Sequence, residues 1–289
     1  MGASATVINR SRRQQIIQPL PLPDPVAFLL RQANYAEFII HPPANPMTHA
    51  GDGPSTRHHT YKQFDQELDG IRAQALALGG LVEEQIGLAM KALVENDADL
   101  AQDVIRNDHR VNCLEVEVNE QCTQVLARRQ PAGGDLRLVV AVLKTITDLE
   151  RIGDDAKRIA RLTLAMGEHY PRKSQLYRLG DFSGRVRMRL KETLDAFSRI
   201  DVDAAFEVKR GDDELDEEYR AIVAEQIAAM SSDLRIIPVA LNLIWIAKAL
   251  ERVGDRSCNI CEYIIYYARG KNVRHLSLEQ AARDLLNDS

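Results

Sequence analysis

The segment Glu150-Arg151-Ile152-Gly153-Asp154 returns almost unchanged as Glu251-Arg252-Val253-Gly254-Asp255. The copies begin about 100 residues apart, a much longer period than the roughly 20–50 residues of solenoid repeats. This separation is typical of two small domains that share one ancestry. The repetition therefore predicts an internally duplicated chain.

Each copy lies in a stretch whose apolar residues recur at helical spacing, so its Glu and Asp lie on one face of a helix. Two carboxylates this close repel each other and favour a cation between them. Gly153 and Gly254 stand in mid-helix, where glycine costs roughly 1 kcal/mol relative to alanine. We interpret both glycines as positions where a neighbouring side chain packs close to the backbone.

A solvated, salt-bridged helix face is the alternative interpretation of each acidic pair. The cations available at helical spacing pair Asp154 with Arg158, Glu251 with Lys248, and Asp255 with Arg252. Arg151 and Arg252 are further candidate partners. This interpretation explains either copy alone, but it leaves the repeated glycine unexplained.

The composition indicates an all-α protein and excludes several classes of function. The 289 residues are 45% hydrophobic but only 5% aromatic, and alternating apolar runs are absent. The net charge of −5, without a dense Lys/Arg block, argues against a nucleic-acid partner. Neither a signal peptide nor an apolar stretch of the roughly 20 residues that span a bilayer is found. The four cysteines fit a reducing cytosol.

Four parts are predicted from periodicity and turn signals. They are an N-terminal extension over residues 1–60, a first three-helix bundle over 61–170, a second over 171–270, and a C-terminal tail over 271–289. The extension is rich in proline and polar residues, so we expect it to be mostly disordered, with Met47 as an alternative translation start. Asp135 is expected to N-cap the third helix, and Trp245 to lie in the core.

The helix before each repeated segment carries two oxygen-bearing side chains at i and i+4. Antiparallel packing would set these side chains against the carboxylates of the repeat, giving one oxygen cluster in each bundle. The predicted metal ligands are Asp108, Asn112, Glu150 and Asp154 in the first bundle, and Asp212, Asp216, Glu251 and Asp255 in the second. Such ligands select hard cations: Mg²⁺, Ca²⁺, Mn²⁺ or iron.

The chain resembles the PhoU family of phosphate-specific transport system accessory proteins over about residues 60 to 275. The resemblance rests on both repeated segments, on Arg129-Gln130-Pro131 followed by Asp135-Leu136-Arg137, and on Asn259-Ile260-Cys261-Glu262. It implies two tandem antiparallel three-helix bundles with pseudo-twofold symmetry. It also implies iron or zinc as the metal, with Mg or Mn as alternatives, and no organic cofactor. Asn112 departs from the family's acidic pattern, which lowers the expected metal affinity of the first cluster.

The resemblance also implies a function. Such a protein is a cytoplasmic negative regulator of the phosphate-starvation response, and it restrains phosphate uptake. Its expected partners are the ATPase subunit of the phosphate ABC transporter and a sensor histidine kinase, which hold it at the inner membrane without insertion. We expect a homodimer without enzymatic activity.

Two other functions are weighed against this one. A metal-free helical scaffold is the first. A di-iron-like enzyme is the second, but its sites use Glu-x-x-His, and Gly153 and Gly254 occupy the histidine positions.

A basic run contains Arg185, Arg187, Arg189 and Lys191. No glycine-rich anion loop accompanies it, and its side chains do not share one helix face. We interpret it as solvated surface, and we expect that the protein does not bind inorganic phosphate directly.

Overall fold

The computed structural model describes residues 54–167, 170–273 and 280. The predictions for residues 1–53, including Met47, and for most of the tail lie outside these residues. The helices are α2 (Pro54–Glu95), α3 (Ala98–Arg129), α4 (Gly133–Met166), α5 (Lys173–Arg199), α6 (Val202–Arg210), α7 (Asp212–Ser232), the 3₁₀ helix η1 (Leu234–Ile236) and α8 (Ile237–Arg269). The described residues contain no strand.

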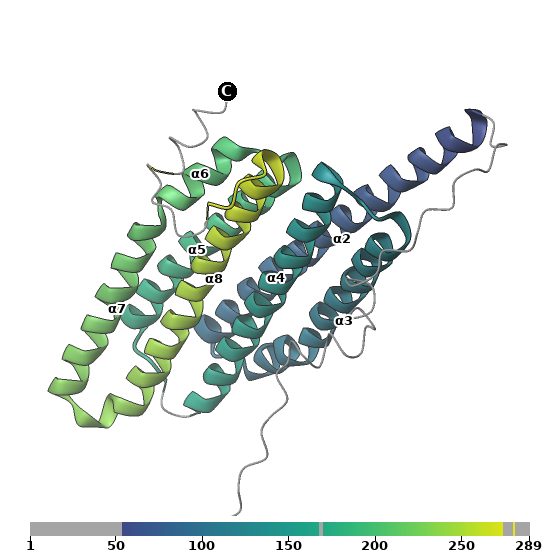
Figure 1. Ribbon diagram of the computed structural model, residues 1–289. Helices are drawn as coiled ribbons and strands as arrows, with labels where there is room; N and C mark the ends of the chain where they lie inside the picture. Colours follow the sequence, from purple (N-terminus) through teal and green to yellow (C-terminus); the bar gives the residue numbers. More distant parts are fainter. Residues whose placement is uncertain (1–53, 168–169, 274–279, 281–289) are drawn as a thin grey trace, which may run out of the picture. The chain divides into compact units, whose positions relative to one another are not determined.

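The helices form two tandem antiparallel three-helix bundles, so the predicted fold class is confirmed (Figure 1). Helices α2, α3 and α4 make the first bundle. The second consists of α5, of α6 together with α7, and of α8. The third helices of the two bundles, α4 and α8, pack side by side and join the halves into one compact unit.

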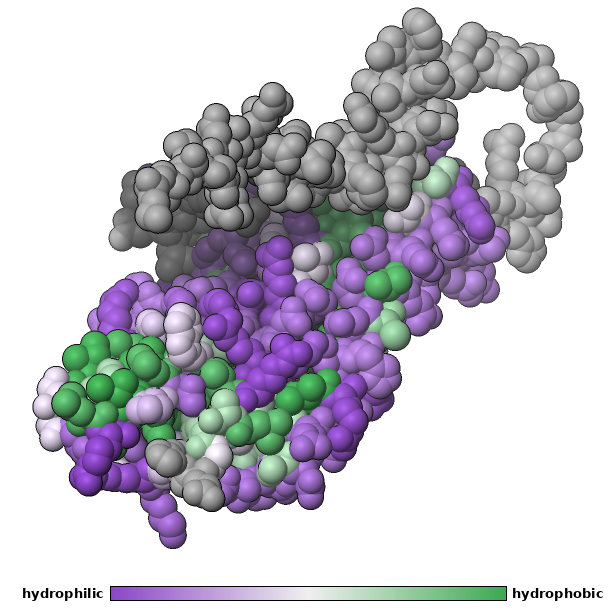
Figure 2. Space-filling view, turned by 90° about the horizontal axis from the view of Figure 1, so that it is seen from below, coloured by the Kyte–Doolittle hydropathy of each residue, from purple (hydrophilic) through white to green (hydrophobic). Residues whose placement is uncertain are grey.

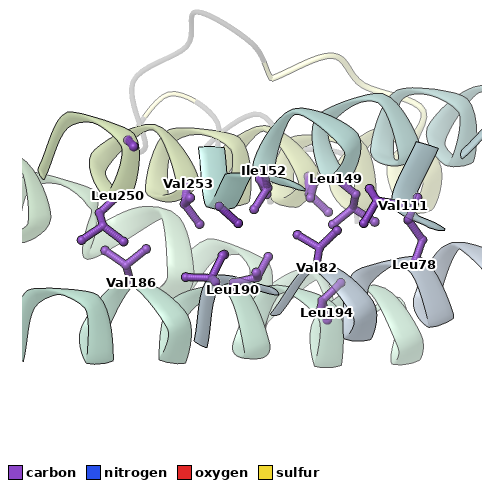
Figure 3. Packing of buried hydrophobic residues seen from close by; sticks show 14 of the residues in the cluster. Leu78, Val82, Val111, Leu149, Ile152, Val186, Leu190, Leu194, Leu250 and Val253 are labelled. Atoms are coloured by element: carbon purple, nitrogen blue, oxygen red, sulfur yellow. The ribbon is translucent and has the colours of Figure 1, made fainter. Parts of the chain in front are cut away.

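One hydrophobic core runs through both bundles (Figure 3). In this view Val82 of α2 lies next to Leu194 of α5, Leu78 lies one turn further along α2 toward Val111 of α3, and Ile152 of α4 lies above Val82. Every α-helix from α2 to α8 contributes apolar residues to this core, and their helical spacing is the pattern that predicted the bundles. The core therefore holds the two repeated segments in fixed positions relative to each other.

The observed helix starts differ from two predictions. Helix α2 begins at Pro54, ahead of the expected start at Tyr61, and proline suits a first helical position because its missing N–H has no partner there. Helix α4 begins at Gly133 with Ala132 as its N-cap, so Asp135 lies in the first turn. There the carboxylate still favours the helix, through the positive end of the helix dipole.

The middle one of the three helices predicted for the second bundle is broken at Gly211 into α6 and α7. Arg189 of α5 packs its guanidinium against Gly211 and donates a hydrogen bond to the Val208 carbonyl at 2.7 Å. The side chain thus satisfies a carbonyl near the end of α6. Arg189 also belongs to the basic run, which is therefore partly structural rather than wholly solvated.

Asp233 caps η1 rather than the long helix that follows. Its carboxylate accepts a hydrogen bond from the Arg235 backbone N–H at 3.0 Å, and α8 begins at Ile237 with a proline in its first turn.

Hydrophobic side chains are exposed at the end of the molecule where α7 turns into α8, the green area at the left of Figure 2. Leu234 is 73% exposed there, and Ile227 and Leu241 are also exposed. Trp245 on α8 is 50% exposed, so the expectation that it lies in the core was wrong. None of the described helices combines the length and apolar composition needed to cross a bilayer.

Candidate metal centre

The repeated glycines bring neighbouring helices close at the level of the carboxylates. A Cβ atom at Gly153 would lie 2.9 Å from Cγ1 of Val111 on α3, and one at Gly254 would lie 3.1 Å from Cδ1 of Leu215 on α7. The prediction of a close neighbour is confirmed for both. The glycines therefore set α3 against α4 and α7 against α8 where the acidic residues face each other.

We expect Gly153→Ala to lower the free energy of unfolding by about 1–2 kcal/mol in urea titrations. The overpacking against buried, β-branched Val111 costs about 1–3 kcal/mol and exceeds the roughly 1 kcal/mol gain in helix propensity. Gly80→Ala is the matched control, because Gly80 is exposed and has no atom within 4 Å of a new Cβ. The control should stabilise the protein by about 0.4–1 kcal/mol. Equal stabilisation by both changes would contradict the close packing.

Three of the four predicted ligands in the second bundle converge. Ligand oxygens of Asp216, Glu251 and Asp255 all lie within 4.8 Å of one another. Glu251 is only 9% exposed. Its Oε1 accepts a hydrogen bond from Lys248 Nζ at 2.5 Å, as the sequence indicated, whereas its Oε2 is buried without a hydrogen-bond partner among the described residues. One oxygen of the cluster is thus free to take a ligand.

Asp212 lies beside this group. The pKa of Asp255 is raised to about 6, first because of partial burial and then because of the negative charges of Glu251 and Asp212. Asp212 also contributes, after burial, to the raised pKa of the neighbouring Cys258 thiol. The fourth predicted ligand is therefore near the cluster, although its oxygens are outside the group of three.

The donor set fits a metal ion. Oxygens on opposite sides of an ion that binds at about 2.0–2.5 Å are separated by roughly 4–5 Å, which agrees with the 4.8 Å limit of the group. Among the described residues, the ammonium close to these four carboxylates is that of Lys248, which pairs with Glu251, and Asp216 also pairs with Arg220 at 3.0 Å. A cation would relieve the remaining repulsion and satisfy the unpartnered oxygen of Glu251.

We expect the metal-free protein to gain thermal stability as the pH falls from 7 to 5. The pKa of Asp255 rises on folding from 3.8 to about 6, so its favourable contribution is complete below pH 3.8 and is lost as the pH rises through 6. With bound metal the trend should reverse, because protons compete with the ion for the carboxylates. Melting curves at both pH values, for the wild type and Asp255→Asn, isolate this contribution. An identical pH dependence in the two proteins would contradict it.

In the first bundle a lysine takes the place that the sequence assigned to a metal. Lys157 Nζ lies 2.5 Å from Oδ2 of Asp108 and 4.0 Å from Oδ1 of Asp154. Asp108 is 4% exposed, and its Oδ1 has no hydrogen-bond partner in the described part of the chain. The pKa of Glu150 is raised by burial and then by the charges of Asp154, Glu115 and Asp108.

Only part of the ligand set predicted for the first bundle is thus brought together. Asp108, Glu150 and Asp154 share one neighbourhood, whereas Asn112 is exposed on α3. Metal binding by this set stays a prediction, and a protein cation already neutralises part of its charge. The sequence contained the signal for Lys157, which lies three residues after Asp154 on the same helix face.

The other proposed ion pairs are made differently. Arg158 lies over the Trp245 ring, 5.2 Å from its centroid, rather than beside Asp154. Arg252 pairs with Asp155, not with Asp255. Cys258 stands in the second repeat where Lys157 stands in the first, so the second cluster has no ammonium at that position.

A polar network that the sequence analysis missed joins α4 to α8. Buried Asp155 of α4 accepts hydrogen bonds from both Arg252 and Arg256 of α8. Asp148 of α4 accepts another from the Tyr263 hydroxyl at 2.9 Å. Asp155 and Arg256 hold corresponding positions in the two repeats. The opposite charges of these two corresponding residues are the sequence signal that could have indicated a contact between the repeats.

The fold and the acidic clusters define a class: duplicated three-helix-bundle proteins with a carboxylate-lined face on each half. A family model described as the PhoU domain matches residues 76–163 and 179–264, one segment in each bundle. The chain belongs to the PhoU family.

Individual relatives are similar in sequence to this chain over most of their length. The chain is 40% identical over 234 residues to the phosphate-specific transport system accessory protein PhoU homolog of Pseudomonas aeruginosa, which covers 81% of this chain and 97% of the relative. It is 42% identical over 227 residues to phosphate-specific transport system accessory protein PhoU of Escherichia coli K12, covering 78% of this chain and 93% of that protein.

Two crystal structures share the fold. That of PhoU from Pseudomonas aeruginosa has a TM-score of 0.69 at 41% identity, and it covers 72% of this chain and 100% of its own. The phosphate transport system regulatory protein PhoU from Streptococcus pneumoniae has a TM-score of 0.68 at 31% identity, with 73% and 99% covered. These proteins are named as accessory or regulatory proteins.

Proposed function

We propose that the protein is a cytoplasmic negative regulator of the phosphate-starvation response that also restrains phosphate uptake. It links the ATPase subunit of the phosphate ABC transporter to a sensor histidine kinase at the inner membrane, and it works as a homodimer without catalysing a reaction. Family membership that extends over both bundles is the observation that carries this proposal. The names of the relatives, which place them in phosphate-specific transport, support it.

The proposed metal centre lies in the second bundle. Asp216, Glu251 and Asp255 would hold the ion, with Asp212 beside them. The metal would be iron or zinc, with Mg or Mn as alternatives, and it would supply positive charge that fixes the relative position of α7 and α8. The free oxygen of Glu251 supports this assignment.

A metal-free scaffold is the second candidate, and it applies best to the first bundle. The contact between Lys157 and Asp108 favours it there. A di-iron-like enzyme has less support. His109, the histidine closest in sequence to a cluster, is engaged by its own helix, with Nδ1 2.6 Å from the Arg106 carbonyl oxygen.

Deletion of the gene in its host tests the proposed regulation. Alkaline phosphatase activity is measured in cells grown in high phosphate. We expect activity close to that of phosphate-starved cells, because in our proposal the protein holds the sensor kinase in its phosphatase mode when phosphate is plentiful, and its loss releases the kinase from that mode. Expression of the wild-type chain, or of the conservative variant Gly80→Ala, should restore repression.

Repression that is unchanged by the deletion would contradict the proposal. Glu251→Gln in the same assay separates the metal from the scaffold. Constitutive activity of this variant at normal protein abundance would show that regulation needs the second acidic cluster. Full repression would assign regulation to the scaffold alone.

A further inference from the structure

Five arginines line a cleft between α4 and α8, where the two repeated segments meet. The arginine cleft consists of Arg151, Arg158 and Arg161 from α4 and Arg252 and Arg256 from α8, together with Asp154 and Asp155. Its volume is about 530 Å³. The second residue of each repeat, Arg151 or Arg252, thus contributes to one shared cleft, and Figure 1 shows the two helices side by side.

The charges of the cleft do not cancel. Asp155 is buried and is neutralised by Arg252 and Arg256. Asp154 is exposed and lies 4.0 Å from Lys157. Arg151, Arg158 and Arg161 are exposed, and none of the three forms a salt bridge within the described residues. Five guanidinium groups against two carboxylates leave the cleft strongly positive.

One contact and one unsatisfied hydrogen-bond donor favour ligand binding in the cleft. Arg158 is stacked over Trp245 at 5.2 Å from the ring centroid, which restricts its guanidinium. The Nε of Arg252 is buried and has no hydrogen-bond partner in the described part of the protein. An unsatisfied donor in the wall of a positive cleft is costly unless an acceptor binds there.

The three unpaired arginines are spread along the cleft. Residues 151, 158 and 161 lie near one helix face, and the ten-residue interval spans roughly 15 Å of helix at 1.5 Å per residue. A single tetrahedral phosphate can reach only part of this row. A ligand with two or three linked phosphates carries more charge and more oxygens, so several flexible arginine side chains can converge on it from different positions along the row. Guanidinium forks match phosphate oxygens in pairs.

We propose that the arginine cleft binds a small anion with a diphosphate or triphosphate group. This site is separate from the basic run at residues 185–191, where Arg185 and Arg187 are engaged with Glu218 and Glu83. It goes beyond the proposed regulation and does not rest on it. Ligand binding there would bridge α4 and α8, and so would couple the two bundles.

Isothermal titration calorimetry with the full chain tests this proposal. Pyrophosphate, ATP and inorganic phosphate are titrated separately in buffer without divalent cations, so that a metal at the acidic clusters cannot recruit phosphate. The cleft variant is Arg151→Gln with Arg161→Gln. The matched control is Arg110→Gln with Arg128→Gln, which removes the same charge from exposed positions on α3.

We expect saturable binding of pyrophosphate or ATP that weakens at least about tenfold in the cleft variant, because charge-assisted hydrogen bonds are lost. The control variant should change binding less than about twofold. ADP is titrated in the same way, because it has as many phosphates as pyrophosphate: tighter binding of ADP than of pyrophosphate would identify a nucleotide as the source of the phosphates, and equal binding would identify a free condensed phosphate.

Several results would overturn the proposal. The first is that neither pyrophosphate nor ATP binds saturably. The second is that binding weakens equally in the cleft variant and the control variant. The third is that inorganic phosphate binds as tightly as pyrophosphate. An oligoglutamate peptide is titrated as well. Binding of this peptide without binding of the phosphate probes would also overturn the proposal and would indicate a protein-docking surface.

Discussion

Replacing Lys157 with methionine should lower the free energy of unfolding by about 3 kcal/mol at pH 7. The change leaves the buried carboxylate of Asp108 without its ammonium partner, and breaking a buried ion pair from one side typically costs about 3–5 kcal/mol. The lower end applies here, because the Lys157 side chain is 21% exposed. Urea denaturation measures the effect directly.

The double variant Lys157→Met with Asp108→Asn should recover most of this loss, because the second change removes the buried charge. Lys91→Met is the matched control, since Lys91 and Glu95 are 3.9 Å apart and both are more than half exposed. Such surface pairs contribute about 0–1 kcal/mol. If Lys157→Met costs no more than Lys91→Met, the lysine does not neutralise the first cluster.

Added Mn²⁺, Zn²⁺ or Fe²⁺ should raise the melting temperature of the chelator-treated wild type, and Glu251→Gln should abolish this rise. An ion present at 100 times its dissociation constant stabilises the folded state by about 2.7 kcal/mol. The variant replaces the most buried carboxylate of the cluster with an amide of nearly the same size and shape. Differential scanning calorimetry with and without metal gives the change.

Glu150→Gln is the control for this experiment, because Glu150 is the corresponding residue of the first bundle. Its metal-dependent rise should match that of the wild type. If the metal-dependent rise in melting temperature were lost in Glu150→Gln but kept in Glu251→Gln, the metal would lie in the first bundle, which would contradict the assignment to the second. No rise in the wild type with any of the three metals would remove the metal centre.

Much of the fold could be predicted because its determinants are local or repeated. Apolar periodicity predicted the helices, and the two mid-helix glycines predicted close neighbours, which are Val111 and Leu215. The break at Gly211 could not be predicted in this way. It is stabilised by Arg189 from another helix, and the local sequence carries no sign of that contact.

The candidate site was predicted in its outline but not in its charge balance. Helical spacing brought Asp216, Glu251 and Asp255 together correctly. It did not reveal which cation each carboxylate selects: Asp108 pairs with Lys157, and Arg252 crosses to Asp155 on the other bundle. These choices depend on how α4 packs against α3 in its own bundle and against α8 of the other bundle. That arrangement became available only with the tertiary structure.

Anomalous diffraction from crystals of the full chain, loaded with Mn²⁺, Fe²⁺ or Zn²⁺, tests the central claim most directly. We expect an anomalous peak among Asp216, Glu251 and Asp255, with Lys157 still in contact with Asp108 and no peak beside that pair. A peak between Asp108 and Glu150, or no peak at Glu251, would contradict the assignment of the metal to the second bundle.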